Sequence, residues 1–550
     1  MRLERITISN YRRLSDLGID VRGHLVLIGA NDVGKTSLLR ALNLALGPTA
    51  QLYQALSAAD IRDHEQPLTV KAVFTDFEDA ERTLFHREID IDPSDHGESL
   101  EVRLEVQVDP DDAESVMITR WCPGRGEVRS LTREQIAAFG WRYLPALRQS
   151  SAAHLDGASG AIQTLLRAVE PELGKEKSAL GGLLESFNEK LESSAALSGL
   201  REGMAKHLSN SMPKSITPDD LAVRTSADPS ISVLENVSMY LSREGSFVPL
   251  SEQSDGIRQL ISMTLFDLAE GAANVIAIDE PELHLHPLSQ RTVAELLSSD
   301  ANQKILVTHS PYIVQKFDPT QVVTVRADGG CHQIDPNRVT VEERTQAHWW
   351  SPRMLEALTA RFAILVEGVA DRLIVEAAAR AQNISLDRIG AVVFELGGAE
   401  NFPAVYRLLG PNGFNVDVLG LVDDAEKGPW LGAVGGKLRH VIGRTVFVSQ
   451  VDLEDEYCRA LGVQTIAQRL IDAGVARDER ALLSSCKVSE ADDLTVEGVA
   501  TFCRSSAGSG KGSRKVPAAL VVAKTLTKEE AAKIASIDGL LSELVKRAGA

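Results

Sequence analysis

The segment from His24 to Leu42 constrains the fold more than any other, because a short apolar run, a glycine-bracketed loop and a helix start follow one another. The loop, Gly29 to Thr36, matches the pattern G-x-x-x-x-G-K-[ST] of a phosphate-binding loop. Its glycines allow backbone N–H groups to close around phosphates at a helix N-terminus. Lys35 would reach the β- and γ-phosphates, and Thr36 would ligate Mg²⁺. The predicted ATP-binding residues of this segment are Gly29, Asn31, Gly34, Lys35, Thr36 and Ser37. The alternative, a chance match in a flexible loop, is weakened by the flanking strand and helix.

Two later apolar runs end in polar residues suited to the same site. Residues 275–279 form a predicted strand that ends in Asp279 and Glu280, and residues 304–308 form another that runs into His309. Asp279 is placed to complete the Mg²⁺ shell, and Glu280 to orient or deprotonate an attacking water. His309 could sense the γ-phosphate, although a lone histidine is usually structural.

The C-terminal part of the chain contains three acidic groups, each behind a predicted strand. Glu367 and Asp371 follow residues 362–366, Asp423 and Asp424 follow residues 418–422, and the third group lies at 452–456. Acids at the carboxyl ends of parallel strands meet at one sheet edge. Oxygen-only shells suit Mg²⁺ or Mn²⁺, and two such metals can stabilise the attacking and leaving oxygens of a phosphodiester displacement. The alternative is that each acid caps a helix or faces water.

The rest of the chain divides into segments that differ in hydrophobic periodicity. Residues 68–77 and 100–108 alternate like antiparallel strands, whereas residues 150–225 have helical spacing, with leucines on one face. We expect those leucines to form core, with a dimerising helical arm as the alternative. The predicted domains are an N-terminal ATPase part, a helical insertion, a C-terminal ATPase part and a second α/β domain, at residues 1–150, 151–230, 231–345 and 358–550.

Composition bounds the class of protein. The 550 residues contain 58 Lys and Arg against 77 Asp and Glu, a formal net charge of −19, which argues against a chain that coats nucleic acid with a general positive field. Five scattered cysteines fit free thiols in a reducing compartment. No signal peptide or membrane span is recognised, so a cytoplasmic protein is expected.

The N-terminal motifs together resemble an ATP-binding-cassette (ABC-type) ATPase of the RecF/SMC-like branch. Residues 8–12 are similar to that branch's opening, residues 251–259 to its signature segment, and residues 281–287 to its D-loop. In that family two heads sandwich ATP, and the signature of one head faces the phosphate loop of the other. The resemblance therefore implies a dimer in which Ser254 and Gly256 act in trans. His284 and His286 lie in this D-loop segment. The alternative interpretation, that they are metal ligands, is disfavoured.

The C-terminal motifs resemble a Toprim domain, the Rossmann-like α/β fold of topoisomerases, primases and certain nucleases. An ATPase followed by Toprim resembles the OLD (overcoming lysogenization defect) family of ATP-dependent endonucleases. The resemblance implies catalytic roles for Glu367, Asp423 and Lys515, beside Glu280 and His309 of the ATPase. It implies metal ligation by Thr36, Asp279, Glu367, Asp371, Asp423, Asp424, Asp452 and Glu454. Lys511, in the same loop as Lys515, is the alternative lysine, and a solvated basic loop is a further one.

The resemblance also implies a function and partners: metal-dependent DNA cleavage regulated by ATP, in phage defence or DNA repair, by a homodimer or higher oligomer with a possible helicase partner. One departure is Ala425, which occupies the second acidic position of the D-x-D motif. It keeps open a RecF-like DNA clamp or sensor with a non-cleaving Toprim domain. A topoisomerase- or primase-like activity is disfavoured, because no module with an active-site tyrosine is recognised. Since carboxylates explain part of the negative charge, DNA binding should be weak without a divalent metal.

Overall fold

The computed structural model describes most of the chain in two compact units. One unit comprises residues 1–143, 274–279 and 294–550, and the other residues 144–273 and 280–293. The described residues are all except 50–51, 53–55, 95, 111, 147–165, 167–172, 212–216, 222–232, 235–236, 238, 244–245, 255, 259, 261–273, 299–301, 339, 341–348, 350, 436–437, 507–511 and 550.

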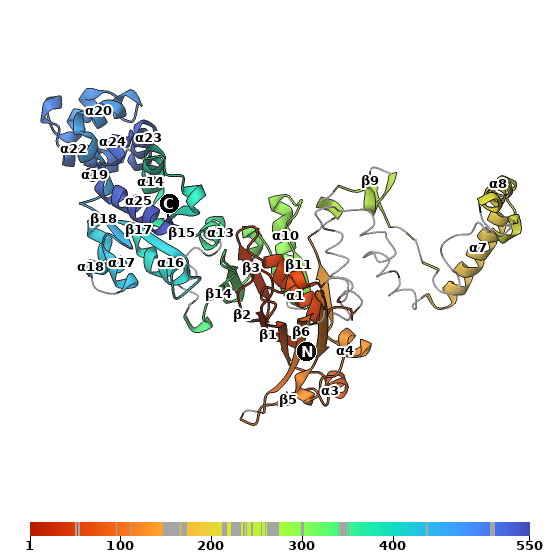
Figure 1. The fold of residues 1–550 in the computed structure, drawn as a ribbon. Coiled ribbons are helices and arrows are strands. Elements are labelled where there is room, and N and C mark those ends of the chain that lie inside the picture. The colour runs from red at the N-terminus through yellow and green to blue at the C-terminus, as the bar shows by residue number, and fades with distance from the viewer. Residues whose placement is uncertain are drawn as a thin grey trace. The chain divides into compact units, whose positions relative to one another are not determined.

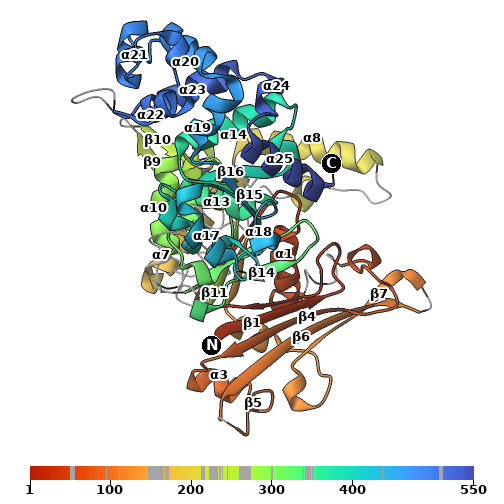
Figure 2. The same cartoon turned by 90° about the vertical axis from the view of Figure 1, so that its left-hand side faces the viewer.

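An antiparallel sheet opens the first unit, with strand order β2-β1-β4-β6-β5 and β7 paired to β6. Its strands are β1 (Arg2–Ser9), β2 (Leu17–Asp20), β4 (Leu68–Thr75), β5 (Asp90–Ile91), β6 (Glu98–Asp109) and β7 (Asp112–Trp121). Figure 2 shows β1, β4, β6 and β7 side by side. Burial alternates residue by residue along β4, as expected for a sheet with one face on a core. The antiparallel strands predicted near 68–77 and 100–108 are confirmed.

A second sheet of the same unit has the order β14-β13-β3-β12-β11-β8. Its strands are β3 (Leu25–Gly29), β8 (Trp141–Leu144), β11 (Val275–Asp279), β12 (Gln303–Val307), β13 (Val322–Val325) and β14 (Cys331–Gln333). β13, β3, β12 and β11 run parallel and are buried along their whole length, which explains their uninterrupted apolar sequences. Helices of this region are α1 (Lys35–Leu46), α3 (Asp79–Leu84), α4 (Arg133–Ala138), α10 (Pro287–Leu297) and α11 (Pro311–Val314).

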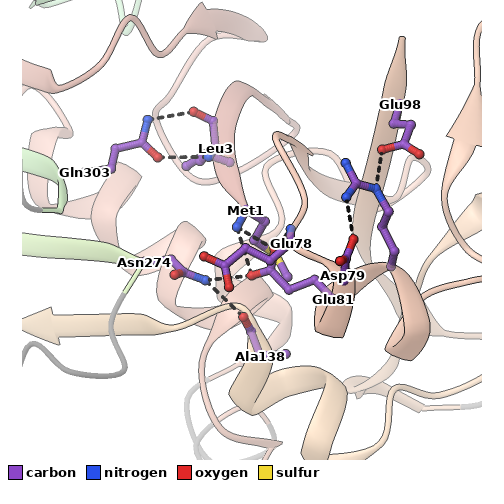
Figure 3. A network of polar contacts seen from close by, with 10 residues as sticks. Met1, Leu3, Glu78, Asp79, Glu81, Glu98, Ala138, Asn274 and Gln303 are labelled. Atoms are coloured by element: carbon purple, nitrogen blue, oxygen red, sulfur yellow. Dashed lines mark hydrogen bonds and ion pairs between the residues drawn. The ribbon is translucent and has the colours of Figure 1, made fainter. Parts of the chain in front are cut away.

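Polar side chains bind these two sheets together. The Gln303 amide, on β12, accepts a hydrogen bond from Leu3 N–H at 2.9 Å and donates to the Leu3 carbonyl at 2.7 Å (Figure 3). Asn274, which directly precedes β11, donates to Glu81 Oε1 on α3 and to the Ala138 carbonyl on α4. These bonds satisfy the backbone N–H and carbonyl of Leu3 and the carbonyl of Ala138. The sequence pattern does not indicate them.

A third sheet, of order β16-β15-β17-β18, forms the C-terminal part, coloured teal to blue in Figure 1. Its strands are β15 (Phe362–Val366), β16 (Ala391–Glu395), β17 (Asp417–Asp423) and β18 (Val446–Ser449), all parallel. The longer helices are α13 (Pro352–Thr359), α14 (Val369–Ala381), α16 (Phe402–Leu409), α17 (Lys427–Val434), α19 (Leu453–Leu461), α20 (Val463–Asp472), α21 (Glu479–Cys486), α22 (Val496–Arg504), α23 (Lys515–Thr525) and α25 (Ala535–Ala548). The strands predicted at 362–366 and 418–422 are confirmed.

The second unit contains α7 (Lys175–Glu192), α8 (Ala195–Ser211) and a hairpin of β9 (Tyr240–Arg243) and β10 (Ser246–Pro249). The expectation that the leucines of this region form core is wrong for the described helices of the single chain. Leu183 is 68% exposed, and Phe187 and Leu200 are also exposed. Among the described elements α7 packs on α8 and α8 on the short turn at 218–220, which is too little surface to cover an apolar stripe. The part of the predicted helical segment at residues 162–169 lies outside the described residues, except Leu166.

The predicted domain boundaries stay predictions. No helix in the described ranges is long and apolar enough to cross a membrane.

Candidate nucleotide and metal sites

The loop between β3 and α1 requires glycine at both glycine positions of the phosphate-loop pattern. Gly29 has φ +153°, and a Cβ there would lie 2.3 Å from the Val325 carbonyl oxygen on β13. Gly34 has φ +103°, and its Cβ would lie 2.6 Å from Leu14 Cδ2. Both backbone conformations are strained for residues with a side chain. The pattern in the sequence therefore reports real steric constraints.

Lys35 lies inside the loop that it closes. Its side chain is buried, and Nζ donates to the carbonyls of Gly29 at 3.1 Å and Ala30 at 2.6 Å. Asn31 and Thr36 are exposed and Ser37 is half-buried. The loop thus presents an ammonium group and hydroxyls at the start of α1, where a phosphate would be held.

Strand register brings Asp279 and His309 to the same sheet edge as the loop. Asp279 on β11 pairs with Val307 on β12, and Val307 pairs with Leu27 on β3. Thr308 N–H then donates to the Leu27 carbonyl at 3.1 Å, and His309 follows half-buried. Asp279 is only 2% exposed. Because these strands are parallel and in register, residues that directly follow them in the sequence lie at the same edge as the phosphate loop.

Glu280 has φ +49°, a left-handed backbone that is unusual for glutamate. Such strain is concentrated at functional sites. The backbone conformation of Glu280 therefore supports a functional role, and it could not be predicted from the sequence.

The signature and D-loop segments touch each other within the second unit. A Cβ on Gly256 would lie 3.0 Å from the His284 carbonyl oxygen, so glycine allows the two backbones to approach. Ser254 is exposed. His284 and His286 are exposed, and neither belongs to a group of metal-binding side chains among the described residues.

The predicted acidic residues of the C-terminal sheet lie behind the ends of three adjacent parallel strands. Glu367 follows β15, Asp423 ends β17, and Asp452 lies three residues after β18. Asp423 Oδ1 accepts a hydrogen bond from Leu453 N–H at 3.2 Å, which joins the β17 end to the start of α19. The expected convergence at one sheet edge is therefore present.

Lys515 lies among these acids although it is distant in the sequence. It is the first residue of α23, and its Nζ is 4.0 Å from Asp371 Oδ1 and 3.8 Å from Glu454 Oε2. α23 packs against α14, the helix that carries Asp371. Lys511 lies outside the described residues. Of the two candidate lysines, Lys515 is the one for which the structure provides a position beside carboxylates.

Two of these acids also cap helices, as the alternative interpretation expected. Asp371 Oδ2 accepts from Gly368 N–H at 2.9 Å, and Asp452 Oδ1 accepts from Asp455 N–H at 2.8 Å. Each keeps a second oxygen for another contact: Asp371 Oδ1 faces Lys515, and Asp452 Oδ2 accepts from Arg504. Capping and a role at the shared edge are thus compatible.

Burial and mutual repulsion alter the acidity of the cluster. Burial raises the pKa of Asp423 to about 8 and of Glu454 to about 7, although the Lys515 charge opposes both increases. Burial also raises the pKa of Glu367 and of Asp371. For Lys515, burial alone would lower the pKa, but Asp371, Glu454, Glu367 and Asp423 outweigh it and the pKa rises. The cluster contains four carboxyl groups and one ammonium group, so its full ionisation would leave it net negative.

The other acids of the sequence motifs have different surroundings. Asp424 is exposed and paired with Lys427, and Ala425 is exposed between them. Asp455 pairs with Arg459. Glu456 accepts from Ser536 N–H at 2.8 Å and from Ser536 Oγ at 2.6 Å near the start of α25.

The donor set fits a hard divalent cation. It is made of carboxylates, and Glu454 Oε2 is buried without a hydrogen-bond partner among the described residues. In that same part of the chain no three His, Cys, Asp or Glu side chains are arranged to enclose a metal. The carboxylates are therefore gathered at one edge without being closed around one point.

Sequence reasoning missed Arg504, which binds Asp452 from the end of α22. It also missed Glu400, whose charge contributes to the raised pKa of Glu367. Neither residue stands in a recognisable motif, so only the fold reveals them.

Comparison with known proteins finds two matching families at different positions along the chain. Residues 25–315 match a family described as an AAA domain (AAA_21), a description that also names the AbiEii toxin of a Type IV TA system. The chain belongs to this AAA domain family. Residues 358–424 match the TOPRIM domain of overcoming-lysogenization-defect-like proteins. The predicted ATPase followed by an OLD-like Toprim domain is confirmed.

Two relatives span both parts. Endonuclease GajA of Bacillus cereus (strain VD045) is 20% identical over 72% of this chain and 71% of its own length. The OLD nuclease of Thermus scotoductus (strain ATCC 700910 / SA-01) is 24% identical over 68% of this chain and 72% of its own length. Among solved structures, the C-terminal region of the Burkholderia pseudomallei OLD protein is 24% identical, with a TM-score of 0.28, over 34% of this chain and 98% of that chain. The homologues are thus nucleases by name.

Proposed function

We propose that the chain is an ATP-binding, ATP-regulated, metal-dependent DNA endonuclease. The observation that carries this proposal is the gathering of Glu367, Asp371, Asp423 and Glu454 around Lys515 at one edge of the Toprim sheet. The relatives named endonuclease and nuclease support the same reaction class.

In this proposal the carboxylates bind the metal ions, and Lys515 binds the substrate phosphate. Glu367, Asp371, Asp423, Asp452 and Glu454 would hold Mg²⁺ or Mn²⁺, with Asp424 near the rim. When bound, such ions lower the pKa of an attacking water and neutralise charge on the phosphate. Lys515 Nζ would exchange its contact with Glu454 for a non-bridging oxygen of the scissile phosphate and stabilise the charge that develops there. Arg504 would fix the orientation of the Asp452 carboxylate.

The ATPase part would control cleavage through a dimer. Gly29, Asn31, Gly34, Lys35, Thr36 and Ser37 would bind ATP, and Thr36 and Asp279 would hold its Mg²⁺. Glu280 and His309 would position the attacking water and sense the γ-phosphate. Ser254, which is exposed, and Gly256 would complete the site of a second copy. DNA is the proposed substrate, with a helicase as possible partner and phage defence or DNA repair, in the cytoplasm, as the setting.

The test is plasmid cleavage by the purified chain with Mg²⁺ or Mn²⁺, with and without ATP. We expect nicked or linear product from the wild type, and none from Glu367→Ala, whereas ATP affinity stays unchanged. Lys35→Ala should remove ATP binding and keep the fold. Equal inactivity of wild type and Glu367→Ala across metals and nucleotides would contradict the proposal.

Ala425 favours a second candidate, a DNA clamp or sensor with a non-cleaving Toprim domain. Its neighbour Asp424 is engaged by Lys427 and not by the cluster. In that case DNA binding should depend on ATP and no cleavage should occur, which the same assay distinguishes when combined with a gel-shift measurement.

A further inference from the structure

Arg326 lies between the phosphate loop and the Toprim sheet, inside a single compact unit. It directly follows β13, whose last residue, Val325, pairs with Gly29 at the start of the loop. The Val325 carbonyl approaches Gly29 so closely that a Cβ there would lie 2.3 Å from it. The backbone that positions Arg326 is therefore in direct contact with the first residue of the phosphate loop.

The other end of Arg326 holds two Toprim carbonyls. Nη1 donates to the Ala360 carbonyl at 2.7 Å, and Nη2 donates to the Phe414 carbonyl at 2.9 Å. Ala360 lies just before β15, and Phe414 just before β17. Because Phe362 and Asp417 pair as the first residues of those strands, one guanidinium fixes the entry of both.

The strands that Arg326 fixes are the two that carry the acidic cluster. β15 leads into Glu367 and β17 ends in Asp423. Strands are stiff along their length, so a displacement at the entry is transmitted to the carboxyl end. The path from the loop to the cluster thus contains one hydrogen-bonded link and two buried strands.

The link is costly for a purely structural contact. Burial lowers the pKa of Arg326 against the opposing charge of Asp328. Its Nε has no hydrogen-bond partner among the described residues. Packing at the same place already exists: the Trp349 ring stacks on Phe414 with centroids 6.2 Å apart. A half-buried cation whose guanidinium donates to two carbonyl groups adds geometry more than stability.

We propose that Arg326 couples nucleotide binding at the phosphate loop to the positions of β15 and β17, and so of Glu367 and Asp423. This inference rests on the proposed function, whose regulation it specifies. Arg326 is a positioning residue: it touches neither nucleotide nor DNA, and it acts through the backbones of Val325, Ala360 and Phe414.

Hydrogen–deuterium exchange of the full chain tests the coupling without any need for cleavage. A non-hydrolysable ATP analogue with Mg²⁺ should slow exchange at residues 29–36 in both wild type and Arg326→Ala. In wild type it should also change exchange at residues 357–366 and 408–420, by about fivefold or more. In Arg326→Ala that second change should vanish, and Arg326→Lys, which can bind one carbonyl at a time, should restore part of it.

Arg361→Ala is the matched control. Arg361 also donates to two backbone carbonyls, those of Ala548 and Arg547, but within the Toprim part. A merely structural role would lower the melting temperature of both alanine variants and leave the nucleotide-dependent change intact in both. If Arg326→Ala keeps the change, or if wild type shows none, the inference is overturned.

The cleavage assay separates this inference from the proposed function. The ratio of cleavage rates with and without nucleotide should move toward one in Arg326→Ala and stay at the wild-type value in Arg361→Ala. A wild type that cuts no DNA contradicts the proposed function, while the exchange experiment still decides the coupling. Absence of protection at residues 29–36 would contradict nucleotide binding, and the coupling with it.

Discussion

The phosphate loop and the Toprim edge lie at corresponding places, the carboxyl ends of buried parallel strands, yet they are built differently. The loop is contiguous, and its chemistry resides in backbone conformation that two glycines permit. The Toprim edge gathers residues from 367 to 515, and its chemistry resides in side-chain charge. A contiguous site is sensitive to shape, and a dispersed one to charge and to the packing of the helices that deliver it.

The largest effect should come from altering the shape of the loop. Gly29→Ala places a Cβ against the Val325 carbonyl and forces a φ of +153°, so we expect a loss of about 1–3 kcal/mol in unfolding free energy and loss of ATP binding. Calorimetric unfolding and nucleotide titration would measure both. Gly428→Ala is the control, because a Cβ there would meet no atom within 4 Å outside its chain neighbours and its own helix backbone. If Gly29→Ala binds ATP normally, the loop is not limited by backbone shape.

An intermediate effect should distinguish two glutamates of α19. Glu454→Gln removes the charge of a buried carboxylate whose Oε2 lies 3.8 Å from Lys515 Nζ and has no hydrogen-bond partner among the described residues, so cleavage should fall by about 100-fold while the melting temperature stays or rises. Glu456→Gln weakens the bonds from Ser536, so stability should fall by about 1–2 kcal/mol with cleavage kept. Plasmid cleavage and thermal unfolding on both variants test this. Parallel losses of activity and stability in both would show that charge at Glu454 has no separate role.

The smallest effect should come from Asp424→Ala. The carboxylate is exposed and paired with Lys427, and exposed pairs contribute about 0–1 kcal/mol. We expect near-wild-type stability and less than about a threefold change in cleavage at saturating Mg²⁺. A metal titration of the cleavage rate would check it. A strong dependence on Asp424 would instead show that this residue substitutes for the missing acid at Ala425.

Most of the buried parallel strands and both motif groups could be predicted from the sequence, because such strands leave uninterrupted apolar runs with polar residues behind them. Glu367, Asp423 and Asp279 belong to that signal. Lys515 could be placed only by resemblance, since its neighbours Asp371 and Glu454 are brought to it by helix packing. Arg504 and Arg326 have partners distant in the chain and carry no local pattern. The leucines of α7 were misjudged because helical periodicity shows that a face is apolar, without showing what covers it.

The position of Lys515 has a consequence for how the proposed site would respond to its surroundings. An ammonium group tethered to α23 competes for the same carboxylate oxygens as any dissolved cation. Occupancy of the carboxylate site is then an exchange between two cations. The Lys515 ammonium group has a fixed local concentration, and the dissolved divalent ion has a variable one. Metal occupancy would then depend on the concentration of divalent cation relative to the local concentration of the Lys515 ammonium group. Each metal that binds would displace the lysine, whose charge could then bind the substrate.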